Sequence, residues 1–326
     1  MALSTPVASY DLRRKGGGGG WIRAAMVVAI VFLAAPNLFA YGTIAWNSFV
    51  DSATPAVNLT STGALMDAGF VFELGVFDAG YIPDPARKWE WQSKWHSAQS
   101  KTYNAVAKNF YGSYQLTSKP IANAPPFTVG AKAYIWGKRG TPGNAEWILM
   151  RKTDWLWPVE NDVAAGGLNW RVREANQIIL GTVNANPTGT PFLMKSAAVT
   201  NLWAEFQATA LAGETLNGPN DDPDHDGVCN LLEFAYVTNP LSAGEYYFPK
   251  VLALDDAGQS YLTMRVERNI DNAILTVQVS SDLVNWYDTG ATTVKENSPE
   301  YLIVRDNTPI TPALPVRFMR LKARLP

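Results

Sequence analysis

Apolar and polar residues alternate strictly along three short segments in the last third of the chain. These segments are residues 261–268 (YLTMRVER), 274–281 (ILTVQVSS) and 317–325 (RFMRLKARL). Successive side chains of a β-strand point to opposite faces, so this period of two indicates strands with one face in a core and the other in water. We therefore expect residues 246–326 to form a small β-sandwich domain.

The first half of the chain has the composition of short strands separated by turns. Residues 70–74 (FVFEL), 133–137 (AYIWG) and 146–151 (EWILMR) are apolar, and the GTPGN sequence between the last two has turn chemistry. The last two segments should therefore pair as a hairpin. Residues 169–184 (NWRVREANQIILGTVN) suit one or two further strands, so we expect residues 41–190 to form a β-rich domain.

Two segments have helical rather than alternating patterns. Residues 84–106 (DPARKWEWQSKWHSAQSKTYNAV) begin with Asp-Pro, contain no internal breaker and carry apolar residues at helical spacing, which predicts a helical insertion in the first domain. Residues 196–211 (SAAVTNLWAEFQATAL) place Val199, Trp203 and Phe206 on one helical face, which predicts an amphipathic helix.

The densest group of acidic residues lies in the stretch NDDPDHDGVCNLLEF. A calcium loop of the helix-loop-helix type needs oxygen ligands at its first, third, fifth and twelfth positions, and glycine at its sixth. Counted from Asp222, these positions hold Asp222, Asp224, Asp226, Glu233 and Gly227. The spacing predicts a calcium site. We expect it in a helix-loop-helix module at residues 191–245, after a linker punctuated by Pro187, Gly189 and Pro191.

Three other positions of this loop have expected roles. Val228, at the seventh position, would supply its backbone carbonyl as a ligand. Asn230, at the ninth, would hold a bridging water and cap the following helix, with Glu233 at capping-box spacing. Cys229, between them, should point inward as a small apolar side chain. The alternative is a solvated acidic turn, which mutual repulsion of three aspartates disfavours without a cation. Magnesium fits less well than calcium, because it prefers a rigid octahedron with retained waters.

Residues 220–240 (NDDPDHDGVCNLLEFAYVTNP) resemble the single calcium loops of dockerins and thrombospondin type 3 repeats. They are most similar to a segment found before C-terminal β-domains of secreted bacterial proteins. Gly218 and Pro219 would break a helix entering the loop, and no second loop follows, so the resemblance implies a structural calcium clamp rather than a cooperative sensor. The sequences FELGVF, EWILMRKTDWLWP and VQVSSDLVNWYDTG resemble uncharacterised exported proteins of Verrucomicrobia-like bacteria, for which no activity is implied.

The composition is that of a folded protein without an intrachain disulfide. The 326 residues are 47% apolar and 17% charged, with a formal net charge of −2. No run rich in lysine and arginine occurs, which argues against nucleic acid as a partner. The single cysteine excludes an intrachain disulfide, so packed cores, a metal ion or both must stabilise the chain.

The N-terminus has the features of a signal peptide. A basic region with Arg13, Arg14 and Lys15 precedes the apolar run at residues 24–35, and a Pro36-Asn37 break and the sequence LFA, ending at Ala40, follow. We expect residues 1–40 to be a signal peptide cleaved after Ala40, with an uncleaved membrane anchor as the alternative. The remaining chain should be secreted or held at the cell surface, without a membrane span of its own.

No catalytic motif is recognisable, so we expect a non-catalytic protein whose partners are calcium and either a polysaccharide or a cell-surface component. The chain has two histidines and no nucleophile elbow, phosphate loop or dinucleotide fingerprint. A glycosidase-type carboxylate pair stays open, with the candidates Glu73, Asp78, Glu90 and Glu146. The other alternative is a carbohydrate-binding module with exposed aromatic platforms, for which the candidates are Trp89, Trp91, Trp95, Trp155 and Trp157. Trp89 and Trp91 cannot share a helical face, so one of them should lie near the surface.

Overall fold

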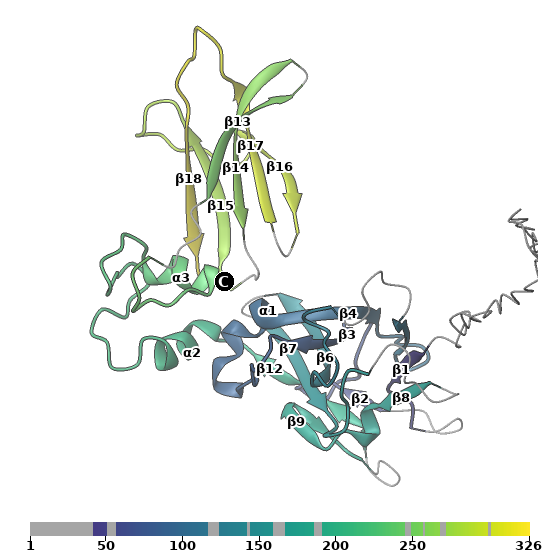
Figure 1. The fold of residues 1–326 in the computed structure, drawn as a ribbon. Helices are drawn as coiled ribbons and strands as arrows, with labels where there is room; N and C mark the ends of the chain where they lie inside the picture. Colours follow the sequence, from purple (N-terminus) through teal and green to yellow (C-terminus); the bar gives the residue numbers. More distant parts are fainter. Residues whose placement is uncertain are drawn as a thin grey trace, which may run out of the picture. The chain divides into compact units, whose positions relative to one another are not determined.

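The computed structural model describes residues 42–50, 57–116, 124–141, 144–158, 167–185, 191–244, 249–256, 258–267, 272–298 and 301–326. Their fold is mainly β, with several sheets and a few short helices, which confirms the fold class expected from the sequence (Figure 1). The predicted signal peptide lies outside these residues. None of the helices in the described ranges has the length and apolarity needed to cross a membrane.

The largest sheet contains six strands, in the order β12-β7-β6-β3-β4, with β9 paired to β7. Their bounds are β3 Val71–Phe77, β4 Trp95–Thr102, β6 Ala133–Thr141, β7 Asn144–Arg151, β9 Gln177–Leu180 and β12 Ala197–Val199. β6 and β7 are antiparallel, with Trp136 opposite Leu149, which confirms the predicted hairpin. The sequence predicts a linker near residue 190, but β12, which follows that linker, still pairs with β7 of this sheet.

Two three-stranded sheets, β5-β1-β8 and β10-β11-β2, complete the β-rich part of the chain. Their bounds are β1 Thr43–Asn47, β2 Asn58–Leu59, β5 Tyr111–Gln115, β8 Leu168–Arg171, β10 Thr182–Val183 and β11 Met194–Lys195. A 3-10 turn, Val172–Glu174, separates β8 from β9. The segment 169–184 therefore contributes to three strands rather than one or two.

Aromatic rings fill both sides of the six-stranded sheet. On one side Phe72 stacks on Phe110, with ring centroids 4.1 Å apart. On the other side Phe77, Trp95 and Trp136 pack into a second cluster. The alternation of side chains along β3 and β6 separates the two clusters, because neighbouring residues of a strand face opposite sides.

The burial of the tryptophans corrects the carbohydrate-platform hypothesis. The five candidate residues are at most 7% exposed: Trp89, Trp91, Trp95, Trp155 and Trp157. Trp89 and Trp91 are both buried because they belong to different apolar clusters, so the expectation that one of them lies near the surface is wrong. None of the five rings is accessible to a sugar.

The predicted helix at residues 84–106 is also wrong over most of its length. A 3-10 helix, Pro85–Glu90, is followed by a single α-helical turn, α1 Trp91–Lys94, and then by strand β4. β4 pairs with β3, and Gly75 of β3 makes room for Trp95, because a Cβ at Gly75 would lie 2.6 Å from Trp95 Cζ2. Sheet pairing and burial of the tryptophan therefore override the helical spacing.

Two short helices follow the six-stranded sheet, α2 Leu202–Thr209 and α3 Asn230–Tyr236. α2 begins later than predicted, because the residues before it form β12 and Asn201 caps the helix by accepting a hydrogen bond from Ala204 N at 3.0 Å. Phe206 of α2 and Phe234 of α3 share one apolar cluster, with ring centroids 5.3 Å apart.

The C-terminal strands form two sheets, β13-β14-β17-β16 and β15-β18. Their bounds are β13 Lys250–Asp256, β14 Gln259–Glu267, β15 Ile274–Ser280, β16 Thr292–Asn297, β17 Tyr301–Pro309 and β18 Phe318–Arg324. Met264, Val277 and Val304 come from both sheets and pack in one core. The three segments with alternating patterns correspond to β14, β15 and β18, as predicted.

Candidate metal centre

The acidic loop lies between α2 and α3 and is closed by its own backbone. Asn230 N donates to Asp221 O at 2.8 Å, and Leu231 N donates to Pro219 O at 3.0 Å. The start of α3 is therefore tied to the residues that precede the acids. This closure brings the predicted first and twelfth positions of the loop to the same region.

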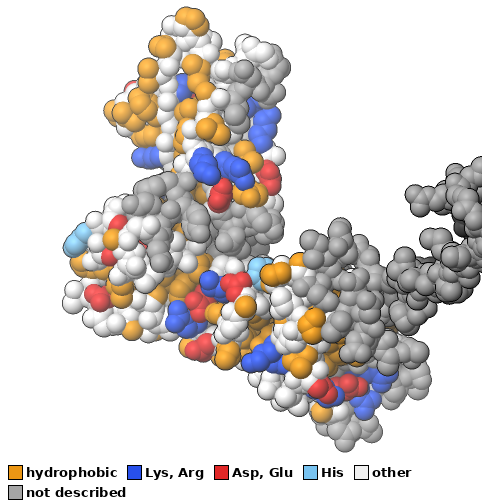
Figure 2. Space-filling view, in the orientation of Figure 1, with side chains coloured by type: hydrophobic (Ala, Val, Ile, Leu, Met, Phe, Trp, Pro, Cys, Tyr) orange, Lys and Arg blue, Asp and Glu red, His pale blue; other side chains and the backbone are white. Residues whose placement is uncertain are grey.

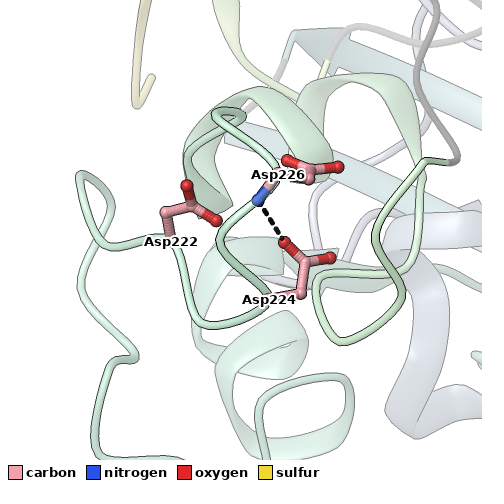
Figure 3. A group of neighbouring side chains, drawn as sticks. All are labelled: Asp222, Asp224 and Asp226. Atoms are coloured by element: carbon pink, nitrogen blue, oxygen red, sulfur yellow. Dashed lines mark hydrogen bonds between the residues drawn. The ribbon is translucent and has the colours of Figure 1, made fainter.

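Each of the three aspartates has one oxygen held by a backbone N–H of the loop. Asp222 Oδ2 accepts from Gly227 N at 2.9 Å, and Asp226 Oδ1 accepts from Val228 N at 2.8 Å. Asp224 Oδ1 accepts from Asp226 N at 3.3 Å (Figure 3). Gly227 has φ of 92°, in the left-handed region that only glycine adopts without cost, which explains glycine at the sixth position. The side chains are thus oriented by the backbone of the loop itself.

The three aspartate carboxylates converge, as the spacing predicts. Each offers an oxygen that lies within 4.8 Å of the corresponding oxygens of the other two. Oxygens that share one calcium ion lie about 2.3–2.6 Å from it, so separations up to roughly 5 Å are compatible with a single ion. Figure 3 shows Asp222, Asp224 and Asp226 around a common space.

Three further carboxylate oxygens of the loop and of α3 have no hydrogen-bond partner among the described residues. Asp222 Oδ1, Asp224 Oδ2 and Glu233 Oε2 are buried and unpaired among the described residues. Buried carboxylate oxygens without a donor or a cation are strongly destabilising, and native proteins rarely leave them so. The converging group consists of the three aspartates, and Glu233 lies outside it, although its unpaired oxygen is buried as well. Three carboxylates with unpaired oxygens fit a hard cation that takes oxygen ligands.

Glu233 carries the largest electrostatic penalty of the group. It lies on α3 and is only 2% exposed. Burial, followed by the negative charges of Asp224 and Asp226, raises the pKa of Glu233 to about 8. Burial, opposed by the hydrogen bond from Asp226 N, likewise raises the pKa of Asp224. A bound cation would oppose both shifts, because its positive charge favours the ionised carboxylates.

Asn230 does not cap α3, which corrects that part of the prediction. The N-cap residue is Cys229, whose side chain makes no capping hydrogen bond, and Asn230 is the first helical residue. Asn230 Nδ2 instead donates to Leu216 O at 3.0 Å and Gly218 O at 2.9 Å, which turns the amide back onto the preceding turn. Its Oδ1 is buried and unpaired, so an acceptor remains for a water. The capping-box pairing is absent as well, because Glu233 Oε1 accepts from Thr238 Oγ1 at 3.4 Å.

The other residues of the loop lie as follows. The Val228 side chain is buried, and His225 is exposed with φ of 61°. Cys229 is half-buried against the cluster that contains Phe234, in line with its expected inward position. Sequence reasoning missed Thr238 and Gly244, whose N–H donates to Asp226 Oδ2 at 3.3 Å. The one sequence feature that indicates a turn after α3 is the Thr-Asn-Pro sequence at residues 238–240.

The four candidate catalytic carboxylates are each engaged by local partners rather than paired with one another. Glu73 accepts from Trp95 Nε1 at 2.6 Å, and Asp78 lies 2.6 Å from His96 Nε2. The other two bind Tyr81 and Arg87 in the case of Glu90, and Ser61 and Ser196 in the case of Glu146. These contacts connect neighbouring elements of the β-rich part.

Comparison with known proteins adds no family to this picture. No known protein-family profile matches the chain, and no curated protein matches it significantly.

Proposed function

We propose that residues 222–233 bind one calcium ion, which stabilises an exported, non-catalytic protein of the cell surface or its matrix. Asp222, Asp224, Asp226 and Glu233 would ligate through side chains, Val228 through its carbonyl, and Asn230 through a water. The observation that carries the proposal is the set of buried, unpaired oxygens on Asp222, Asp224 and Glu233. When bound, the ion would supply positive charge and complete the coordination of these oxygens.

The position of α3 supports a structural role for such an ion. Leu231 and Phe234 of α3 belong to the cluster that contains Trp89 and Phe206, whereas Tyr236 belongs to the core of the C-terminal sandwich. Asn272, just before β15, donates to Phe234 O at 3.1 Å and to Trp89 O at 2.8 Å. A ligand bond at Glu233 would therefore restrain a helix on which both clusters depend.

The expected affinity is low, because a single loop in an exported protein has no paired loop to support it. Extracellular calcium modules bind with Kd on the order of 10⁻⁴ to 10⁻³ M. Binding to the folded state alone stabilises by RT ln(1 + [L]/Kd), which is roughly 1.4 kcal/mol at calcium about tenfold above Kd.

Thermal unfolding with calcium and with chelator tests the proposal. Calcium should raise the Tm of the wild type, and Asp224→Ala should abolish this rise, because it removes one of the unpaired oxygens. Asp154→Asn is the matched control, since the Asp154 side chain is 65% exposed and lies outside the loop, and it should keep the full calcium response. If wild type and Asp224→Ala melt alike under both conditions, the loop is only an acidic turn.

A further inference from the structure

The C-terminal sandwich packs a four-stranded sheet against a two-stranded sheet. Between the sheets, β18 lies against β14 and β15 lies against β16. β13 is the edge strand next to β14, so no strand of the described residues lies opposite β13. The strand order, β13-β14-β17-β16 over β15-β18, is that of the first six strands of a seven-stranded immunoglobulin-type sandwich. In that arrangement a further strand of the smaller sheet pairs with the free edge of the sixth strand, which here is β18.

The core of the sandwich is open on this side, between β13 and β18. Val251 of β13 is directly opposite Met264 in the register, so both face the core, yet Val251 is 42% exposed whereas Met264 is 2% exposed. The core-facing residues Met319 and Leu321 of β18 are only half-buried. Val277, which faces the same core from the neighbouring β15, is 3% exposed. Apolar side chains therefore reach the surface along β13 and β18, and Figure 2 shows apolar side chains at the surface of the C-terminal strands.

The backbone of β18 is unpaired along the same side. β15 pairs with one edge of β18 along its whole length, without a register shift. No other strand in the described ranges pairs with β18, and none of their loops forms a backbone hydrogen bond with its other edge. The outer edge of β15, by contrast, is occupied in part, because Val279 forms a β-bridge with Tyr287. A regular edge without proline or bulge offers its N–H and C=O groups to an added strand.

Two cations lie beside this free edge, on the outer face of β18. Lys322 and Arg324 are exposed, and the residues opposite them on β15 are uncharged. Neither cation forms an ion pair with a carboxylate of the described part of the chain. Arg320, on the same face, is already engaged, because it donates to Gln278 Oε1 at 2.9 Å and lies 4.3 Å from the centre of the Trp286 ring. The outer face therefore carries two positive charges without a counter-charge along the open part of the edge.

We propose that the free edge of β18 takes up an extended strand of another protein, in which apolar residues alternate with acidic residues. This role goes beyond the proposed calcium site and does not depend on it. The apolar residues would cover Val251 and Leu321, and the acidic residues would lie beside Lys322 and Arg324, since neighbouring residues of a strand face opposite sides. Opposite charges on paired strands stabilise a sheet and like charges destabilise it. A second copy of this chain, paired through the same edge, would bring its own β18 cations to this face, so the charges favour a different, acidic partner.

Fluorescence anisotropy with labelled peptides tests the proposal on residues 40–326, which form one compact unit. The probe is a blocked peptide of alternating valine and glutamate residues, and the matched control peptide alternates valine and lysine. The glutamate peptide should bind, and the lysine peptide should bind about tenfold more weakly or worse, because its charges oppose those of Lys322 and Arg324. The bound glutamate peptide should slow hydrogen exchange of the β18 amides, which an added strand would protect. Polyglutamate, which lacks the apolar residues, should compete poorly.

Charge reversal tests the part played by the cations. Lys322→Glu/Arg324→Glu should weaken binding of the glutamate peptide about tenfold and should strengthen binding of the lysine peptide, because both changes act on the same cross-strand pairs. The matched control is Lys108→Glu/Lys132→Glu, at two exposed lysines of the β-rich part, and it should bind both peptides as the wild type does.

A second pair of variants tests the apolar side of the added strand. Val251→Ser should weaken binding of the glutamate peptide about fivefold, because the peptide would bury less apolar surface there. Val294→Ser is the matched control, since Val294 is opposite Val304 of the core, lies on the other edge strand, β16, and is 56% exposed. This control should bind as the wild type does.

Three results would overturn the proposal. Equal binding of the two peptides, or wild-type affinity in Lys322→Glu/Arg324→Glu, would show that the cations do not select the partner. Loss of binding on charge reversal, with no effect of Val251→Ser and no protection of the β18 amides, would assign the cations to an acidic ligand that adds no strand. Failure of the glutamate peptide to bind would show that Lys322 and Arg324 keep this edge from pairing at all.

Discussion

Glu233 is a carboxylate that the folded chain buries among other carboxylates. It is the twelfth residue of the acidic loop, lies on α3 and has one oxygen without a partner. Without a cation the favourable state of such a group is protonated, because burial and neighbouring charge both oppose ionisation. The pKa of Glu233, raised to about 8, expresses this cost.

The first prediction follows from this raised pKa and concerns stability in the presence of chelator. Between about pH 4.5 and pH 8 the folded state holds a proton on Glu233 that the unfolded state has lost, so stability from this group falls as pH rises through that window. The total loss should be on the order of a few kcal/mol. Urea unfolding across this pH range measures it, and Glu233→Gln should remove most of the slope. A wild-type slope unchanged by the substitution would show that Glu233 is not the source.

The second prediction places the same residue in calcium. Calcium needs the ionised carboxylate, so binding at neutral pH should displace the proton from Glu233, and apparent affinity should rise with pH up to about pH 8. Isothermal titration calorimetry in two buffers of different ionisation enthalpy measures the released proton. Identical heats in both buffers at pH 7 would contradict the expectation.

At the residue scale, the spacing of acids and glycine was sufficient to predict which aspartates converge. The convergence of the three aspartates depends only on local backbone geometry, since each aspartate is oriented by an N–H two or more residues further along the loop. The role of Asn230 was not predictable, because it depends on the carbonyls of Leu216 and Gly218, which local spacing does not place. The same holds for Thr238, whose contact with Glu233 requires the chain to turn back after α3.

Among the elements, α3 has the most varied environment, since its side chains enter two apolar clusters. Asn272 fixes its C-terminal half by donating to Phe234 O and to Trp89 O from a buried amide. The third prediction is that Asn272→Ala lowers the free energy of unfolding by about 1–3 kcal/mol, because two buried carbonyls lose their donor. Urea unfolding measures the loss. The matched control Asn220→Ala, at an exposed position, should stay within about 0.5 kcal/mol of wild type, and an equally small effect at Asn272 would contradict the assigned role.

Elements with strict alternation were predictable and elements with mixed patterns were not. β14, β15 and β18 follow their period-two patterns because the apolar residues of each pack into one core, and on β15 the polar Gln278 and Ser280 of the other face are buried as well. Residues 84–106 contain tryptophans at helical spacing. Trp89 nevertheless lies in a 3-10 helix and Trp95 in strand β4, and Trp91 alone lies in an α-helical turn. Spacing alone does not distinguish these outcomes, because the deciding contact is the pairing of β4 with β3, which is distant in sequence.

At the scale of the whole molecule, the acidic loop also binds the segment that leads from α3 to the C-terminal strands. Gly244 N donates to Asp226 Oδ2, so order in the loop and order in residues 239–244 are coupled. The fourth prediction is that chelation of calcium accelerates chymotrypsin cleavage after Leu241, which is 45% exposed in this segment. Asp224→Ala should be cleaved at the fast rate whether or not calcium is present. Equal rates for the wild type with calcium and with chelator would show that the loop and this segment are not coupled.

The acidic loop should hold one calcium ion, and anomalous diffraction from calcium-saturated crystals of residues 40–326 tests this most directly. We predict a single anomalous peak bounded by Asp222, Asp224, Asp226 and Glu233, with the Val228 carbonyl among its ligands. Crystals grown with chelator should lack the peak while the aspartates keep their backbone hydrogen bonds. A calcium-saturated crystal with no peak at this position, and with the oxygens of Asp222, Asp224 and Glu233 hydrogen-bonded only to protein or water, would contradict the account.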